Sequence, residues 1–126
     1  MLYAILCYND ERMVEGLSKE EDDAVIAKRE VVQRKLTAQG RLGPVARLMP
    51  TTAATTLRAG REAIVLDGPF AETKEQLLGF YIVDCASLEE AIATARELKG
   101  DETSGAFEIR PLRVFRPGQA QPGQPG

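Results

Sequence analysis

Residues 2–8 (LYAILCY) form a short run that is apolar on both of the sides that alternate along an extended chain. The two sides consist of Tyr3, Ile5 and Cys7, and of Leu2, Ala4 and Leu6. A strand with this pattern is buried on both of its faces. The chain must therefore fold around a sheet whose two faces are both covered.

Three patterns in which Ser or Thr precedes Glu or Gln by three residues predict where helices begin. The pattern at 18–21 starts a helix that ends near Gly40, and the pattern at 87–90 starts one that ends near Gly100. The pattern at 73–76 predicts about one helical turn. The first helix has an apolar stripe consisting of Ala24, Val25, Ala27, Val31, Val32 and Leu36.

The remaining runs of apolar and β-branched residues predict strands in addition to the one at 2–8. They lie at 41–48, 54–58, 62–66, 79–85 and 107–115. The short polar link at 59–61 makes a β-hairpin of the two runs that flank it. Two helices and these strands, in this order, predict an α+β sandwich of the ferredoxin-like kind with an added β-hairpin. Residues 1–116 form the predicted domain, and the Pro/Gly/Gln tail at 117–126 is predicted to be disordered.

Both predicted helices cover the same face of the sheet, so the other face is left bare. The first strand is apolar on that face too, and an exposed apolar sheet face is a liability unless another subunit covers it. Pairing of two copies about a twofold axis covers it most simply. We therefore expect a homodimer with a site between the two sheets.

Composition excludes several classes of function. The chain contains no His, which excludes His general bases and His-ligated metals, and its net charge of −3 argues against nucleic-acid binding. No apolar run approaches the ~20 residues of a membrane span, and the amino terminus lacks signal-peptide features. Cys7 and Cys85 fall in apolar stretches and are predicted to be free, buried thiols. We expect a cytoplasmic protein that uses neither metal nor cofactor and binds no membrane.

Residues 67–75 (DGPFAETKE) carry the most specific motif of the chain. This motif resembles the signature of the DGPF branch of the YCII-related domain family, with supporting matches at 79–81 (GFY) and 108–111 (EIRP). The resemblance implies a dimeric α+β barrel of ferredoxin-like subunits. Some members of the branch resemble companions of extracytoplasmic-function sigma factors, which implies a regulatory setting.

Two departures from the family pattern bear on function. Other YCII-related proteins carry a His–Asp pair proposed as an acid–base dyad, and this mechanism does not transfer to a chain without His. Most members of the branch also have Gly-Gly before the aromatic pair, where this chain has Leu78-Gly79. If the first glycine lets a ligand approach the backbone, Leu78 narrows the site.

Asp67 and Arg110 are the principal candidate site residues, because in a ferredoxin-like sheet both can reach the face that the helices leave uncovered. Asp67 ends a strand beside a Gly-Pro turn, where a carboxylate acts either as a general base or as a brace for the turn. Arg110 shares one strand face with Glu108, so both lie inside the barrel if a partner covers that face. A buried guanidinium either anchors an acidic ligand or pairs with a protein carboxylate.

Three further side chains are candidate ligand-binding residues, each with a simpler alternative. Glu72 is a candidate acid or base but also fits a solvated charge near a helical turn. Lys74 is a candidate anion site or a surface lysine, and Tyr81 either donates its hydroxyl into a pocket or packs in the core.

These residues are compatible with two functions. The first is a small-ligand binding or accessory module, linked through the family resemblance to a sigma-factor regulator. The alternative is a cofactor-independent enzyme that acts on a small anionic or carbonyl metabolite, with Asp67 as acid or base. The absence of His leaves no obvious proton-transfer pair, which favours the binding module.

Overall fold

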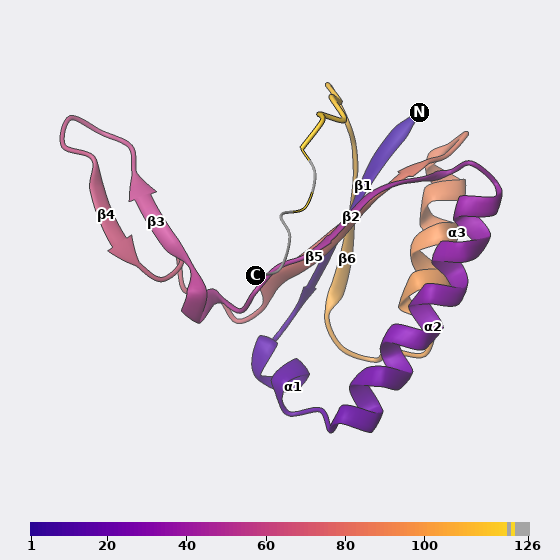
Figure 1. Ribbon diagram of the computed structural model, residues 1–126, viewed down its shortest axis with the longest axis horizontal. Helices are drawn as coiled ribbons and strands as arrows, with labels where there is room; N and C mark the ends of the chain where they lie inside the picture. The colour runs from indigo at the N-terminus through magenta and orange to yellow at the C-terminus, as the bar shows by residue number, and fades with distance from the viewer. Residues whose placement is uncertain (121, 123–126) are drawn as a thin grey trace.

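The computed structural model describes residues 1–120 and 122 and contains one four-stranded antiparallel sheet with helices on one face (Figure 1). The sheet has the order β2-β5-β1-β6. Its strands are β1 (Leu2–Asn9), β2 (Leu42–Arg47), β5 (Gln76–Asp84) and β6 (Ala106–Pro111). The helices that cover it are α2 (Lys19–Ala38) and α3 (Leu88–Lys99). This βαββαβ arrangement confirms the predicted ferredoxin-like α+β fold.

Local capping explains where the two long helices begin. The Ser18 side chain accepts from the amide of Glu21 at 3.1 Å, and the Glu21 carboxylate accepts from the amide of Ser18 at 3.0 Å. At α3, the Ser87 hydroxyl accepts from the amide of Glu90 at 3.2 Å. Each bond satisfies an amide that has no partner within the helix, so both predicted starts are confirmed.

The prediction of a helical turn at 73–76 is wrong. Gln76 is instead the first residue of β5, where it pairs with Asn9 of β1, and its side chain donates to the carbonyl of Thr73. Pairing between distant strands therefore outweighs the local capping pattern. The structure also contains a short helix that was not predicted, α1 (Glu11–Glu15). The Asp10 side chain caps this helix by accepting from the amide of Arg12.

The hydrophobic core lies between the sheet and the two helices. Its sheet side is formed by alternate residues of β1 and β5, and its helix side by small and aliphatic residues of α2 and α3. The buried members are Tyr3, Ile5, Cys7, Leu36, Tyr81, Val83, Cys85, Ala91, Ala95 and Leu98. Cys7 and Cys85 are free thiols in this core, as expected.

The predicted hairpin forms, but it stands apart from the main sheet. Strands β3 (Thr55–Arg58) and β4 (Ile64–Asp67) make a separate two-stranded sheet that follows a 3-10 turn, η1 (Thr51–Ala53). It projects from the body of the molecule (Figure 1), and we call residues 55–67 the arm. At its base the amide of Gly68 donates to the carbonyl of Ala54 at 2.7 Å.

The helix-free face of the sheet is open in the single chain. Leu6 and Phe80 lie opposite each other on it and are half-buried. Among the described residues the sheet ends at β2 and β6 without closing, so the barrel and the dimer stay predictions. Strand β6 ends at Pro111, four residues short of the predicted end, and the amide of Leu112 donates to the carbonyl of Leu2.

The carboxyl-terminal tail lies partly outside the described residues. Of the predicted disordered segment 117–126, residues 121 and 123–126 are outside them. In the part of the chain that the structure describes, no helix has the length and apolar character that a membrane span requires.

Candidate functional site

The residues singled out from the sequence do not meet in one cavity of the single chain. Asp67 ends β4 on the arm, and Glu72 and Lys74 follow it in an exposed loop. Arg110 lies opposite Ala4 on the helix-free face, where its exposed guanidinium pairs with Glu108. Tyr81 is opposite Ile5, on the helix-covered face.

The separation of Asp67 from Arg110 has a clear structural cause. The sequence interpretation placed the strand that ends at Asp67 in the main sheet, from which it would reach the same face as Arg110. That placement is wrong, because β4 pairs only with β3 in the arm among the described strands. The shared face of Glu108 and Arg110 is confirmed, since Phe107 and Ile109 pack against the core on the other side.

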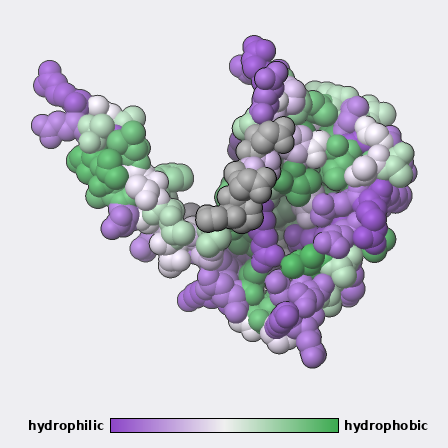
Figure 2. Space-filling model, viewed as in Figure 1, coloured by the Kyte–Doolittle hydropathy of each residue, from purple (hydrophilic) through white to green (hydrophobic). Residues whose placement is uncertain are grey.

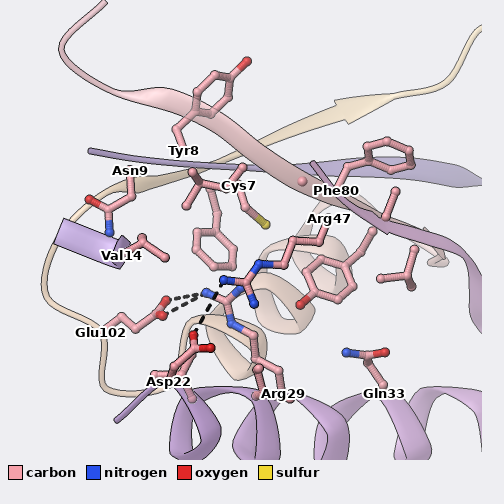
Figure 3. Close-up of a pocket in the computed structure, with 18 of the residues that line it drawn as sticks. Cys7, Tyr8, Asn9, Val14, Asp22, Arg29, Gln33, Arg47, Phe80 and Glu102 are labelled. Atoms are coloured by element: carbon pink, nitrogen blue, oxygen red, sulfur yellow. Dashed lines mark hydrogen bonds and ion pairs between the residues drawn. The ribbon is translucent and has the colours of Figure 1, made fainter. Parts of the chain in front are cut away.

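A cavity of about 340 Å³ lies between α2 and the helix-covered face of the sheet (Figure 3). Strands β1, β2 and β5 form its floor, and α1 and the loop after α3 line one end of it. Its apolar side chains include those of Val14, Leu17, Val25, Ile26, Val45, Leu78 and Phe107. The polar groups around it include Cys7, Asp22, Arg29, Gln33, Arg47, Tyr81 and Glu102.

The cavity exists because only one end of α2 is packed on the sheet. Leu36, near the end of the helix, is 2% exposed and is the only buried residue of α2. Arg29 and Val25, which face the same side about two and three turns nearer the start, are only partly buried. The first half of α2 therefore stands over a space that no apolar side chain fills.

Arg29 is the central charged group of this space. Its Nη2 atom donates to both carboxylate oxygens of Glu102, at 2.9 and 2.7 Å. Its Cζ atom lies 5.4 Å from the centre of the Phe107 ring, a cation–π contact. About a quarter of the Arg29 and Glu102 side chains is exposed, so the pair is largely desolvated.

Arg47 supplies a second guanidinium at the mouth of the cavity. In Figure 3 the guanidinium groups of Arg29 and Arg47 both point into the space. The Nη2 atom of Arg47 lies 3.6 Å from Oδ1 of Asp22, which is an ion pair but too long for a hydrogen bond. Among the described residues, no three Cys, Asp or Glu side chains gather closely enough to hold a metal ion.

The Cys7 thiol and the Tyr81 hydroxyl are protonated at neutral pH, and burial raises the pKa of both further above it. Burial raises the pKa of Cys7 from 9.0 to about 11, although the charge of Arg29 opposes this. Burial likewise raises the pKa of Tyr81, again against the opposing charge of Arg29. A protonated thiol is a poor nucleophile, so the cavity presents a hydroxyl and a thiol that act as neutral polar groups.

The raised pKa of Cys7 predicts a loss of stability in alkali. In the unfolded chain this thiol loses its proton near pH 9, while the folded protein retains it up to about pH 11. The stabilisation is thus complete below pH 9 and lost as pH rises through 11, a fall in the free energy of unfolding of about 2–3 kcal/mol. Urea unfolding under reducing conditions at pH 8 to 11 measures it. Cys7→Ala should flatten this dependence, whereas a Cys85→Ala variant with the same flattening would contradict the assignment.

Sequence reasoning identified Tyr81 but missed Arg29, Arg47 and Glu102. The predicted apolar stripe of α2 is partly wrong, because Val31 is 58% exposed. The inward face instead follows positions 25, 29, 32 and 36, and so includes Arg29. This spacing is visible in the sequence, but an arginine in such a position is usually assigned to solvent.

Leu78 occupies the position at which the family pattern has a glycine. It lies on β5 and lines the cavity, where its side chain reduces the free space. Its carbonyl accepts from the amide of Leu48 at 2.8 Å, which ties the segment after β2 to β5. Leu78 therefore borders this cavity, and its effect on a ligand stays a prediction.

The fold and the cavity define a ferredoxin-like α+β protein with an internal space of ligand size between one helix and the sheet. The model of the YCII-related domain matches residues 1–116. An uncharacterized protein of Rhizobium meliloti (strain 1021) is 59% identical over 121 residues, which cover 94% of this chain and 98% of that protein. The chain belongs to the YCII-related domain family.

Proposed function

We propose that the protein binds a small, partly apolar molecule in the cavity beneath the first half of α2. The observation that carries this proposal is the open space itself, which is about 340 Å³ and bordered by apolar side chains and a few convergent polar groups. Cavities of this size and composition are typical of small-molecule sites. Of the residues singled out from the sequence, Tyr81 takes part in this site.

Binding without turnover fits these side chains better than catalysis. The chain has no His, and burial raises the pKa of both Cys7 and Tyr81, so neither supplies a base or nucleophile near neutral pH. A link between this binding and a sigma-factor regulator stays a prediction from the family resemblance. The roles predicted for Asp67, Glu72, Lys74 and Arg110 also stay predictions, since these side chains are exposed in the single chain.

Filling the cavity tests the proposed function. A panel of small aromatic and aliphatic fragments is titrated into isotopically labelled protein, and amide shifts around Val25, Gly79 and Tyr81 report binding. Val25→Phe places a ring in the cavity and should abolish these shifts. Val31→Phe adds the same volume to the solvent side of α2, where Val31 is 58% exposed, and should leave them unchanged. Equal shifts in both variants, or none with any fragment in the parent protein, would contradict the proposal.

We also propose that the protein is a homodimer in which a second copy covers the arm and the helix-free face. Figure 2 shows hydrophobic side chains gathered along the arm. The apolar side chains of its two strands are half or more exposed: Leu57, Ile64, Val65 and Leu66. A lone two-stranded hairpin is marginally stable, and a twofold axis would provide each arm with a partner surface.

Charges introduced on the arm should disrupt this dimer. Leu57 and Val65 lie opposite each other across the two strands, so Leu57→Lys with Val65→Lys places two charges on one apolar surface. Light scattering at micromolar concentration should give twice the chain mass for the parent protein and one chain mass for this variant. Val31→Lys, a change on the exposed side of α2, is the control and should remain dimeric. A parent protein that is a stable monomer contradicts the proposal.

A further inference from the structure

Arg29 brings more N–H groups into the cavity than its neighbours use. Both oxygens of Glu102 accept from the same nitrogen of Arg29, Nη2. The Nε atom is buried and has no hydrogen-bond partner among the described residues. An unsatisfied buried donor destabilises a fold, and such groups in native structures are usually satisfied by water, an ion or a ligand.

A second arginine of similar burial, Arg41, has no such unused donor nitrogen. Arg41 is similarly buried, with 22% of its side chain exposed against 24% for Arg29. Its Nε atom donates to the carbonyl of Asp84, Nη1 to Gln39 and Nη2 to Thr94, at 2.8–3.0 Å. All three nitrogens of Arg41 are therefore used within the protein, as expected for a structural arginine.

Arg47 is the second donor and is only loosely held. Its distance of 3.6 Å to Asp22 is longer than a hydrogen bond, and 60% of its side chain is exposed. A weakly paired, exposed guanidinium can exchange its partner at little cost. Because Arg47 also points into the cavity, a ligand can replace Asp22 as its acceptor.

The charges around the cavity favour a ligand with a single negative charge. Two guanidinium groups, Arg29 and Arg47, face the carboxylates of Asp22 and Glu102, and the exposed Glu30 also lines the cavity, so the lining has no excess of positive charge. A second negative charge on the ligand would meet repulsion from both carboxylates. The N–H groups of a guanidinium match the planar oxygens of a carboxylate, and the apolar wall suits a hydrocarbon body.

We propose that the cavity binds the carboxylate group of a mostly apolar acid between the guanidinium groups of Arg29 and Arg47. The Tyr81 hydroxyl lies along the same cavity as a neutral polar neighbour. This inference rests on the proposed function and specifies the class of its ligand.

A matched pair of probes separates the carboxylate from the hydrocarbon. Isothermal titration calorimetry compares 4-phenylbutyrate with its uncharged amide, 4-phenylbutanamide. We expect the parent protein to bind the acid at least about tenfold more tightly, the effect of one charge-assisted hydrogen bond. Arg47→Gln and Arg29→Lys should each lower the affinity for the acid to about that for the amide. Arg34→Gln changes an exposed arginine of the same helix and should retain it.

The outcomes distinguish this inference from the proposed function. Equal affinities for acid and amide would overturn the inference but leave small-molecule binding intact. An acid preference that survives Arg47→Gln and Arg29→Lys would place the anion elsewhere and also overturn it. If neither probe binds while other fragments bind in the cavity, the inferred ligand class is wrong. If no fragment binds at all, the proposed function itself is refuted. If Arg29→Lys does not fold, Arg47→Gln decides, because the Arg47 side chain is largely exposed.

Discussion

Replacing Gly79 with Ala should lower the free energy of unfolding by about 3 kcal/mol or more. Gly79 lies in β5, between Cys7 of β1 and Arg47 of β2. A Cβ atom there would lie 2.3 Å from the carbonyl oxygen of Ala46 and 3.1 Å from Cα of Arg47. Both are backbone atoms, so no side-chain rotation relieves the clash and β2 itself must move.

The same change should disturb the cavity, because β2 carries Arg47 to its mouth. Thermal unfolding measures the stability, with a fall in melting temperature of roughly 10–20 °C for a domain of this size. Gly16→Ala is the control. Gly16 has a φ of −77°, and its nearest Cβ contact is 3.2 Å, to the carbonyl oxygen of Arg12, so less than about 1 kcal/mol is expected. A Gly79→Ala variant that melts like the parent would show that β2 does not approach β5 this closely.

The sequence predicted those parts of the fold that depend on local signals. Ser18 and Ser87 mark helix starts because each bonds to an amide three residues away. The strand at 2–8 is recognisable because its apolar residues alternate on both sides. The prediction of a helical turn at 73–76 failed because a distant contact decides the structure there: Gln76 pairs with Asn9, which is far away in the chain.

The candidate site was less predictable because its residues come from distant segments. Arg29 and Glu102 are 73 residues apart in sequence, and neither belongs to the motif at 67–75. That motif drew attention to Asp67, Glu72 and Lys74, which the single chain leaves exposed. Tyr81 was found because it follows the motif in a strand, but its pairing with Ile5 assigns it to the helix-covered face rather than to that of Arg110.

Arg29 has a structural role as well as the proposed role in binding, and stability measurements should reveal it. Arg29→Met keeps much of the side-chain length but leaves the Glu102 carboxylate, only 26% exposed, without its partner. We expect a loss of about 2–3 kcal/mol, somewhat below the value for a fully buried pair because both side chains are partly solvated. Lys28→Met breaks the neighbouring ion pair of Lys28 with Asp101, whose side chains are 65% and 80% exposed, and should leave the stability nearly unchanged.

Removing the charge of Glu102 as well should restore most of the stability that Arg29→Met loses. In the double variant Arg29→Met with Glu102→Leu, no unpaired carboxylate remains beside the cavity and two apolar side chains replace the ion pair. Apolar replacements of desolvated ion pairs are often neutral or stabilising, so urea unfolding should place the double variant within about 1 kcal/mol of the parent. The expected non-additivity identifies the unpaired Glu102 as the source of the loss in Arg29→Met. If the two changes instead add, the loss comes from packing of the Arg29 side chain on Phe107, 5.4 Å from its guanidinium carbon, and the ion pair contributes little.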